Sequence, residues 1–491
     1  MILIRLNEDN FQYDIYSLTK AFFPEEEVKT ILDGQEEDPK ADRILQIQYQ
    51  KDQVILSFFH KENREKALEQ KFFWNSMERK LQKNQLKIAL YEMLQQVAKK
   101  ELPWGNLTGI RPVKIVMGML EQGISEKNTE RELANTYCMS QEKVQLGMEI
   151  AKRELEVLHT FDYKTGYSLY VGIPFCPTTC LYCSFTSYPI GLWRERTEAY
   201  LTALFQELSY VAERMKGKRL DSVYVGGGTP TTLTEQQLER LIHTIRRLFD
   251  CSQVKEFCVE AGRPDSITKE KLRVLQECGV ERISINPQTM NQDTLRIIGR
   301  QHTVEDIKRA FLEARETGFT TINMDIILGL PGEGMEHLAH TLDEIEQLAP
   351  ENLTIHSLAL KRAARLNIQL ERYKDSVNCD PVHMMEEAQR RASAMGLVPY
   401  YLYRQKNMGG NLENVGYARP GHIGLYNILI MEEKQTIVAC GAGASTKRVW
   451  TEPNPDGTHR IERCENVKDV ATYIERIDEM IERKQQLFAK E

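Results

Sequence analysis

Three cysteines within eight residues carry the clearest chemical signal in this sequence of 491 residues. They form the pattern Cys176-x-x-x-Cys180-x-x-Cys183, directly after a predicted strand. Thiolates ligate iron–sulfur clusters and structural zinc, and three of them can hold three irons of a [4Fe–4S] cluster while the fourth iron stays open to a cofactor or substrate. Zinc is the main alternative, but no fourth cysteine or histidine has zinc-ligand spacing, since His159 and His243 are remote. A chance grouping in a reducing compartment is the other alternative.

A glycine run, Gly226-Gly-Gly-Thr-Pro230, follows the next predicted strand. Consecutive glycines let backbone N–H groups approach a ligand closely, as in phosphate-binding loops. The run lacks the Gly-Lys-Ser/Thr ending of a P-loop, which disfavours nucleoside triphosphate hydrolysis. Taken alone, it is equally compatible with a tight turn.

Six short β-branched segments alternate with amphipathic helical segments from Ser168 onward. The predicted strands are Ser168–Ile173, Ser222–Val225, Glu256–Glu260, Arg282–Ile285, Thr321–Ile327 and Leu353–Leu358. The predicted helices are Thr197–Lys216, Glu235–Phe249, Lys269–Cys278, Val304–Thr317 and Met335–Leu348, with N-cap signals at Thr234-x-x-Gln237 and Thr303-x-x-Asp306. Six β-α units in series predict an α/β fold with a parallel sheet, either a partial (β/α)6 barrel or an open sheet.

The chain is long enough for two or three domains. We expect an N-terminal α+β domain over residues 1–160, of unknown role, with strands at Ile44–Tyr49 and Gln53–Phe59 and a helix from about Phe73 to Lys100. The partial barrel is expected over residues 165–370 and a mixed, substrate-covering region over residues 371–491.

The composition excludes several classes of protein. Hydrophobic residues make up 41% and charged residues 27%, which is typical of globular proteins and not of disordered or fibrous ones. The net charge of −7 gives no general reason to bind nucleic acid or anionic membrane, and no apolar run of about 18 residues predicts a membrane span. Because the N-terminus turns acidic without a signal-peptide pattern, we expect a cytoplasmic protein. The scattered cysteines do not form a disulfide framework and are expected to be small buried residues: Cys138, Cys251, Cys258, Cys278, Cys379, Cys440 and Cys464.

Further candidate residues, three of them polar, lie at or near the carboxyl ends of the predicted strands. Glu260 ends the third strand, Gln288 follows the fourth, Asp325 lies in the fifth and Ala359 follows the sixth. Because α/β folds build their sites at this edge, these residues are expected to surround the cysteine loop.

These motifs together resemble the radical S-adenosylmethionine (SAM) superfamily. Within it, four segments resemble the oxygen-independent coproporphyrinogen III oxidase (HemN-like) family: Tyr170-Val-Gly-Ile-Pro-Phe-Cys, Val225-Gly-Gly-Gly-Thr-Pro-Thr, Arg282-Ile-Ser-Ile-x-x-Gln288 and Met324-Asp-Ile-Ile-Leu-Gly-Leu-Pro-Gly332. The resemblance covers about residues 165–445. The segment Leu107-Thr-Gly-Ile-Arg-Pro112 and the chain length look most like the HemZ branch.

The resemblance implies one [4Fe–4S] cluster on Cys176, Cys180 and Cys183, and two bound SAM molecules. The first SAM would contact Tyr170, Gly227, Glu260, Ala359 and, as a weaker match, Cys440. The second would contact Tyr182, Gly228, Thr229, Gln288, Arg300 and Asp325. The types of these side chains suit SAM, since carboxylates accept from ribose hydroxyls or ammonium and arginine pairs with a carboxylate.

The implied activity is an oxidoreductase step of porphyrin and heme biosynthesis. A 5′-deoxyadenosyl radical takes hydrogen from a propionate of coproporphyrinogen III, and two such cycles yield two vinyl groups. The partners would be a tetrapyrrole substrate, a low-potential electron donor and an electron acceptor. The alternatives are a radical SAM enzyme that opens or methylates heme, and a heme-binding carrier of the HemW type.

The sequence departs from the oxidase pattern at two places. Phe185 stands where oxidases of the family commonly have a further cysteine, and the Cys-x-Tyr-Cys-x-Phe form resembles the heme-trafficking branch. Lys361, Arg362 and Arg365 replace an acidic stretch; they could bind propionates or lie on a solvated helix face. His422 and Tyr426 match a His-Asn-x-x-Tyr motif of the family whose asparagine is not retained here. The resemblance implies a tetrapyrrole contact for both, although a lone histidine is more often structural. Arg404, Lys406 and Arg419 are further candidate propionate contacts.

Overall fold

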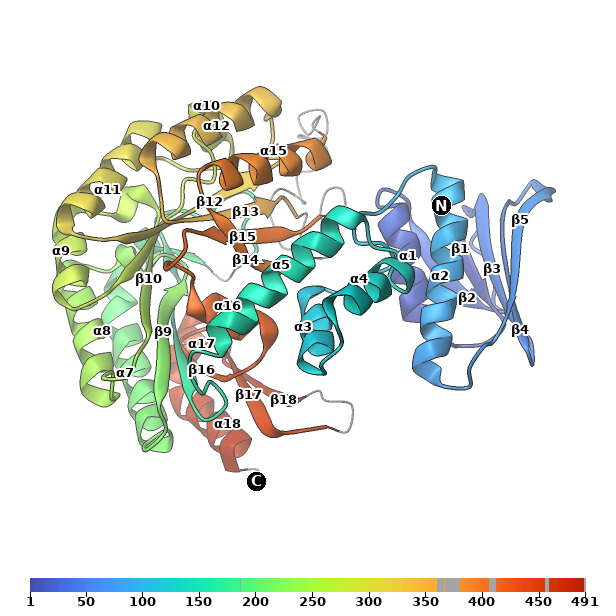
Figure 1. Ribbon diagram of the computed structural model, residues 1–491. Coiled ribbons are helices and arrows are strands. Elements are labelled where there is room, and N and C mark those ends of the chain that lie inside the picture. Colours follow the sequence, from blue (N-terminus) through green and yellow to red (C-terminus); the bar gives the residue numbers. More distant parts are fainter. Residues whose placement is uncertain (186, 360–365, 367–379, 406–411, 455–458, 490–491) are drawn as a thin grey trace. The chain divides into compact units, whose positions relative to one another are not determined.

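The computed structural model describes residues 1–185, 187–359, 366, 380–405, 412–454 and 459–489 (Figure 1). The chain divides into two compact units. The first comprises Met1–Ala151 with Arg404–Leu412, and the second comprises Lys152–Tyr403 with Glu413–Glu491.

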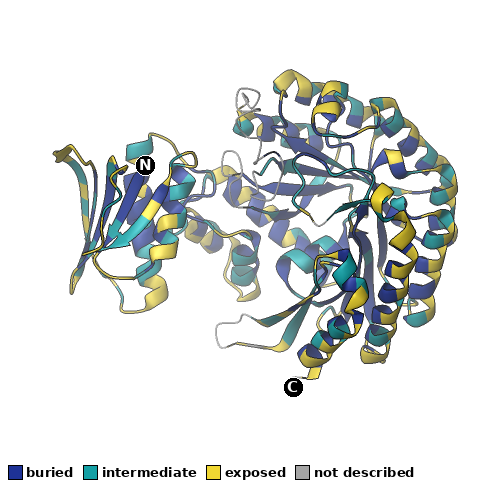
Figure 2. Ribbon diagram, turned by 180° about the vertical axis from the view of Figure 1, so that it is seen from behind, coloured by how far each residue is buried: buried dark blue, intermediate teal, exposed yellow. Residues whose placement is uncertain are grey.

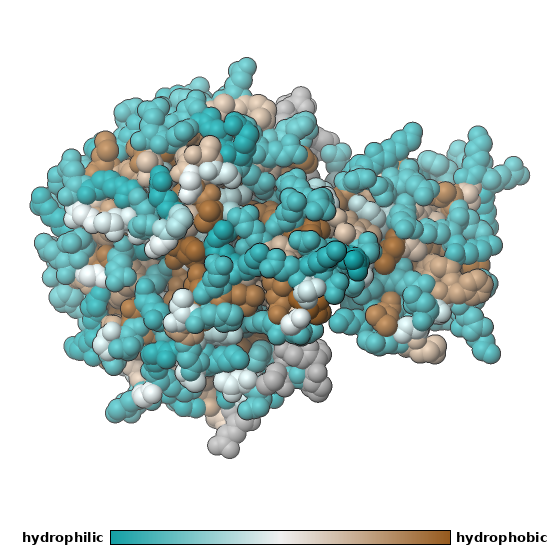
Figure 3. Space-filling model, viewed as in Figure 1, coloured by the Kyte–Doolittle hydropathy of each residue, from teal (hydrophilic) through white to brown (hydrophobic). Residues whose placement is uncertain are grey.

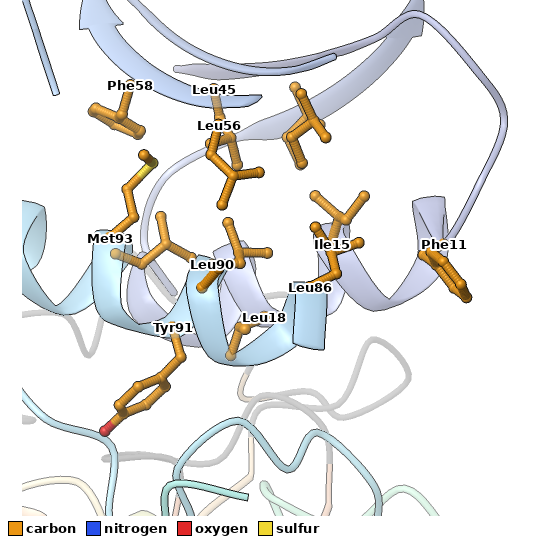
Figure 4. Packing of buried hydrophobic residues seen from close by; sticks show 14 of the residues in the cluster. Phe11, Ile15, Leu18, Leu45, Leu56, Phe58, Leu86, Leu90, Tyr91 and Met93 are labelled. Atoms are coloured by element: carbon orange, nitrogen blue, oxygen red, sulfur yellow. The ribbon is translucent and has the colours of Figure 1, made fainter. Parts of the chain in front are cut away.

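The first unit contains a five-stranded sheet of order β2-β1-β3-β4-β5, in which β1 is parallel to both β2 and β3. Helices α1 and α2 pack their apolar side chains against this sheet, so that Leu45 and Leu56 of the strands share one core with Leu86 and Leu90 of α2 (Figure 4). The elements are β1 (Ile2–Leu6), α1 (Gln12–Phe22), β2 (Val28–Leu32), β3 (Arg43–Tyr49), β4 (Gln53–His60), β5 (Asn63–Phe73), α2 (Arg79–Ala98), α3 (Val113–Glu121), α4 (Glu126–Asn135) and α5 (Gln141–Leu158), which continues into the second unit.

Two predictions for the first unit are confirmed and one needs correction. Strands β3 and β4 lie where the alternating pattern predicts them. The long helix begins at Arg79 and not near Phe73. The reason is that Asn63–Phe73 forms β5, which pairs with β4 as an antiparallel hairpin.

The second unit is built on an 11-stranded sheet, of which the six predicted strands form a continuous parallel part in sequence order. Their bounds are β6 (Tyr167–Ile173), β9 (Leu220–Gly227), β10 (Glu256–Gly262), β11 (Arg282–Ile285), β12 (Thr321–Leu328) and β13 (Asn352–Ser357). This arrangement confirms the predicted α/β fold and its partial barrel.

Five helices cover the outer face of this parallel sheet (Figure 1). They are α7 (Thr197–Arg214), α8 (Glu235–Leu248), α9 (Lys269–Glu277), α11 (Val304–Thr317) and α12 (Met335–Leu348). Their buried stripes face the strands and their exposed stripes face solvent (Figure 2), as the helical periodicity predicts. Thr234 and Thr303 each form both hydrogen bonds of a capping box, which fixes where α8 and α11 begin.

The C-terminal residues extend the same sheet. Strand β16 (Thr436–Cys440) is a further parallel strand beside β6. The antiparallel strands β17 (Ser445–Pro453) and β18 (His459–Glu465) continue that end, while β15 (Asn414–Ala418) and β14 (Val398–Tyr403) continue the end at β13. The smaller elements are β7 (Phe175–Cys176), β8 (Tyr188–Pro189), α6 (Ile190–Trp193), α10 (Gln292–Ile297), α15 (Pro381–Ala394), α16 (Leu425–Glu432), α17 (Val470–Glu475) and α18 (Ile477–Ala489).

The surface is mostly hydrophilic, as expected for a sequence without a long apolar run. Hydrophilic side chains predominate on the face drawn in Figure 3. Among the helices that the structure describes, none combines the length and the apolar character needed to cross a membrane.

Candidate functional site

The cysteine loop leaves the carboxyl end of β6 and lies against the glycine run, which begins in the last residues of β9. The N–H groups of Gly228 and Thr229 donate to the carbonyl oxygens of Ile173 and Phe175, each over 2.7 Å. A Cβ on Gly228 would stand 2.6 Å from the Phe175 carbonyl oxygen, so this approach requires glycine. The glycine run therefore supports the cysteine loop.

The side chains of Thr229 and Arg263 donate hydrogen bonds to two of the cysteine thiols. Thr229 Oγ1 lies 3.5 Å from Cys176 Sγ, and Arg263 Nη1 lies 3.7 Å from Cys180 Sγ. The buried guanidinium of Arg263 also donates two hydrogen bonds, of 3.0 and 2.5 Å, to the carboxylate of Asp265. A buried cation and a hydroxyl donor favour anionic thiolates and a negatively charged cluster. Arg263 was not predicted from the sequence.

The three thiols fit a cluster better than a single metal ion. Burial raises the pKa of the Cys176 thiol to about 11; the Thr229 hydrogen bond opposes this rise, and the nearby Cys180 and Cys183 thiols add to it. Within the described ranges, no three His, Cys, Asp or Glu side chains converge as the ligands of one ion must. In a [4Fe–4S] cluster each thiolate binds a different iron, so its ligands stand farther apart. Three thiols on one loop are the donor set that can hold three irons of such a cluster.

Three stacked tyrosines lie beside Glu260. Tyr170 and Tyr224 occupy paired positions on β6 and β9 with ring centroids 6.2 Å apart, and Tyr426 of α16 stacks on Tyr224 at 4.4 Å. The Tyr224 hydroxyl donates to Glu260 Oε1 over 2.5 Å. Burial raises the pKa of Glu260 to about 7, while the Tyr224 hydrogen bond lowers it and the charge of Asp325 raises it further. Tyr224 was missed, because only the register of the sheet places it beside Tyr170.

The pKa of Asp325 is shifted in the opposite direction to that of Glu260. Burial acts to raise the pKa of its carboxyl group, but the neighbouring His356 and Asn323 hold that pKa below the usual value. His356 Nε2 lies 3.8 Å from Asp325 Oδ2, and Asn323 Nδ2 donates to Oδ1 over 2.7 Å. Environments that push the pKa values of two neighbouring carboxyl groups apart are common in functional sites.

Four of the residues predicted for a second SAM make two pairwise contacts, Arg300 with Tyr182 and Gln288 with Asp325. Arg300 donates from Nη2 to the Tyr182 hydroxyl over 3.2 Å and from Nη1 to the Asn286 carbonyl over 2.5 Å. Arg300 Nε is buried and has no hydrogen-bond partner among the described residues. The Gln288 N–H donates to the Asp325 carbonyl over 2.9 Å. Gln288 has a φ of 70°, a left-handed conformation that is uncommon outside glycine.

A cavity of about 190 Å³ opens between the cysteine loop and the turn after β16, and Tyr170, Phe185 and Gly227 are among its lining residues. Cys440 ends β16 opposite Val171 of β6, so it reaches the same edge of the sheet, and its side chain is fully buried. Ala359 lies two residues beyond the end of β13 and is half-buried.

Several candidate substrate contacts are not brought to this site. His422 lies at the amino edge of the sheet: its Nδ1 is 2.8 Å from Thr321 Oγ1 at the start of β12, and its carbonyl oxygen accepts from Asn352 at the start of β13. Arg419 lies near the same edge, where its N–H donates to the Glu351 carbonyl. The hypothesis that His422 contacts tetrapyrrole is therefore not supported, because this histidine forms hydrogen bonds with the amino ends of β12 and β13.

Arg404 is buried in the first unit, and its Nη1 donates to the Leu107 carbonyl oxygen over 2.6 Å. It therefore holds the loop that the sequence places before Pro112. The remaining cationic candidates lie outside the described residues: Lys361, Arg362, Arg365 and Lys406.

Comparison with known proteins agrees with this geometry. Residues 170–345 match the Radical SAM superfamily. The chain is 42% identical over 416 residues to the oxygen-independent coproporphyrinogen-III oxidase-like protein HemZ of Bacillus subtilis, which covers 83% of this chain and 82% of that protein. It is 40% identical over 195 residues to the heme chaperone HemW of Bacillus subtilis, covering 40% of this chain and 51% of that protein.

Two further comparisons concern the oxidase of Escherichia coli. Its oxygen-independent coproporphyrinogen III oxidase is 34% identical over 192 residues, covering 39% of this chain and 42% of that protein. The solved structure of coproporphyrinogen III oxidase (HemN) from Escherichia coli matches with a TM-score of 0.53 at 23% identity, over 65% of this chain and 70% of that chain, which shows the fold. The chain therefore belongs to the radical SAM superfamily and, within it, to the oxygen-independent coproporphyrinogen III oxidase-like family, in the HemZ branch.

Proposed function

We propose that this protein is an oxygen-independent coproporphyrinogen III oxidase (dehydrogenase), which converts two propionate side chains into vinyl groups. The observation that carries the proposal is the pair of contacts that joins Tyr182 to Arg300 and Gln288 to Asp325, all expected at a second SAM site. It offers hydroxyl, guanidinium and carboxylate groups next to the cysteine loop, which suits a second SAM beside the first. Retention of Gln288, Arg300 and Asp325 favours catalysis, although carriers of the family share some of this set.

The cysteine loop would hold the cluster, and Tyr170, Gly227 and Glu260 would hold the first SAM. When bound, these groups supply a 5′-deoxyadenosyl radical, which removes hydrogen from the β-carbon of a propionate; loss of CO2 and of one electron to an acceptor then leaves a vinyl group.

The side chains of this protein bind and orient the cofactors and the substrate, and they exclude water. Glu260 carries a proton part of the time near neutral pH, since burial raises its pKa to about 7, so its carboxyl group can donate to or accept from a ligand hydroxyl. Asp325 stays anionic and accepts from a hydroxyl or an ammonium group. The unpartnered Nε of Arg300 offers a donor to a carboxylate.

A heme-binding carrier is the second candidate, and Phe185 favours it. This side chain is 71% exposed and lines the cavity beside the cysteine loop. An exposed aromatic ring at that place suits contact with a flat apolar macrocycle. The relative named heme chaperone HemW also covers 40% of this chain.

The decisive experiment is anaerobic turnover. The full chain is reconstituted with iron and sulfide, then given dithionite, SAM and coproporphyrinogen III, and protoporphyrinogen, CO2 and 5′-deoxyadenosine are followed by mass spectrometry. Two decarboxylations coupled to 5′-deoxyadenosine formation support the oxidase. Deoxyadenosine without decarboxylation overturns the oxidase but keeps a radical enzyme, with heme opening or methylation tested next. No product from protein with an intact cluster favours the carrier.

A further inference from the structure

A buried polar network ties the C-terminal helix to the cofactor edge of the sheet. Glu207 of α7 and Lys484 of α18 are both fully buried, with Nζ 2.6 Å from Oε1. The same carboxylate accepts from Asn466 Nδ2 over 2.7 Å, from the Tyr473 hydroxyl over 2.5 Å and from the Gly441 N–H over 2.8 Å. Each carboxylate oxygen thus has two donors. A buried ion pair with all its partners in place strongly favours one arrangement.

This Glu207 network also joins two loops. Asn466 Nδ2 donates to the Gly441 carbonyl over 2.8 Å, and the Gly443 N–H donates to the Val467 carbonyl over 2.8 Å. The first loop is the turn after β16 and the second is the segment after β18. The pairing of β17 with β16 and β18 fixes the strand ends beside these loops, and the hydrogen bonds of the Glu207 network then tie the two loops to each other.

Both loops line the cavity of about 190 Å³ beside Tyr170 and Gly227, the first through Ala442–Ala444 and the second through Lys468. The Lys468 carbonyl accepts from the Tyr188 hydroxyl over 3.3 Å, and Tyr188 pairs with Phe175 of the cysteine loop, so the backbone of Lys468 is fixed there. Its side chain is exposed, and among the described residues its ammonium group has no ion-pair partner.

The size of the cavity restricts what it can accept. Pockets that enclose a whole drug-sized ligand usually measure about 300–1,000 Å³. A cavity of about 190 Å³ fits one arm of a larger ligand. Lys468 lines this cavity with an exposed side chain, and its ammonium group favours an arm that ends in a carboxylate.

We propose that Lys468 binds a carboxylate of the ligand in this cavity, and that Glu207, Asn466 and Lys484 are positioning residues that hold the cavity wall. Two ligands carry such a group: the methionyl part of SAM and a propionate of the tetrapyrrole. The inference rests on the proposed SAM site beside Tyr170 and Gly227, and it holds whichever tetrapyrrole reaction follows.

The test of Lys468 is a binding measurement on the full, cluster-reconstituted chain. Dissociation constants for SAM and for coproporphyrin III are measured separately and anaerobically. Lys468→Gln is expected to weaken one of them about tenfold, as the loss of a charge-assisted contact does, while Lys468→Arg keeps it within about threefold. Lys164→Gln, at an exposed lysine without an ion pair in the described residues, should change neither.

The two binding measurements identify which carboxylate Lys468 contacts. Weaker SAM binding assigns it to the methionyl part, and weaker coproporphyrin binding assigns it to a propionate. Unchanged affinity for both overturns the role of Lys468. Because no arm measures turnover, its result is independent of the oxidase assay.

The positioning role is tested by hydrogen exchange. Tyr473→Phe removes one donor from the network and keeps the ring, so the chain should fold even if Glu207→Gln does not. Faster amide exchange is expected in residues 441–444 and 466–468, together with a weaker affinity for the ligand that Lys468 binds, while strand β9 exchanges as before. Unchanged exchange, or faster exchange with unchanged affinity, overturns the role.

Discussion

The Tyr224 hydroxyl donates to Glu260 Oε1 over 2.5 Å, and Tyr224 stands directly opposite Tyr170 on the neighbouring strand. This contact places a protonatable carboxyl group beside stacked tyrosine rings, at the edge of the sheet where the cofactors are proposed to bind. Since the pKa of Glu260 is raised to about 7 and that of Asp325 is lowered, the two carboxyl groups differ in protonation near neutral pH.

Folding stability should fall as the pH rises through the range set by Glu260. Burial raises the pKa of this carboxyl group from 4.5 to about 7 in the folded chain, so the folded chain keeps a proton that the unfolded chain releases. The stabilisation is fully present below pH 4.5 and is lost as the pH rises through about 7. The shift alone implies about 3 kcal/mol, and solvent screening of this half-buried residue reduces the loss to about 1–2 kcal/mol.

Denaturant unfolding at pH 5 and pH 8 measures this loss. Glu260→Gln, which has no titrating group, should remove that part of the difference between the two pH values. An equal difference in the variant and the parent chain would show that other groups cause it.

Cys180→Ala should abolish cluster assembly while the chain stays folded. The thiol is one of three ligands and receives a hydrogen bond from Arg263, so no other group can replace it at that position. Iron content, visible absorption and circular dichroism after reconstitution check this. Cys278→Ala, at a buried cysteine beyond α9, is the matched control and should retain the cluster. Full iron content in Cys180→Ala contradicts the ligand assignment.

Gly228→Ala should destabilise the protein by about 1–3 kcal/mol, the usual cost of overpacking. The added Cβ would stand 2.6 Å from the Phe175 carbonyl oxygen and 2.9 Å from that of Ile173, and so would push the cysteine loop away. Cluster yield should fall with it. Gly191→Ala is the control, because a Cβ there meets nothing within 4 Å. Equal unfolding free energies for both variants would sink this account of the glycine run.

If the proposed second SAM site exists, Arg300→Lys should reduce the bound SAM from two equivalents to one and leave the cluster intact. Lysine cannot donate to the Tyr182 hydroxyl and the Asn286 carbonyl at the same time. The turn that carries Gln288 therefore loses a hydrogen bond that holds it in place. Equilibrium dialysis counts the SAM, and decarboxylation should slow by about tenfold to a hundredfold. Arg296→Lys, whose side chain is 69% exposed, should behave as the parent chain. Two equivalents bound to Arg300→Lys would remove this residue from the second site.

The family and the order of the six β-α units followed from the sequence alone. The spacing of Cys176, Cys180 and Cys183, the glycine run and the capping signals at Thr234 and Thr303 are local features. Strand and helix periodicity is local too, so these elements could be predicted without knowing their partners. The structure confirms their order and places their ends within a few residues of the predicted bounds.

The tertiary structure decided which distant residues meet. Tyr224 matters because sheet register sets it beside Tyr170, and Lys484 matters because α18 packs on α7, where it reaches Glu207 across 277 positions of the chain. The opposite lesson comes from His422, which is only four residues from Tyr426 but lies at the amino edge of the sheet. Pairing order and register bring such residues together or separate them, and no pattern within a short segment contains that information.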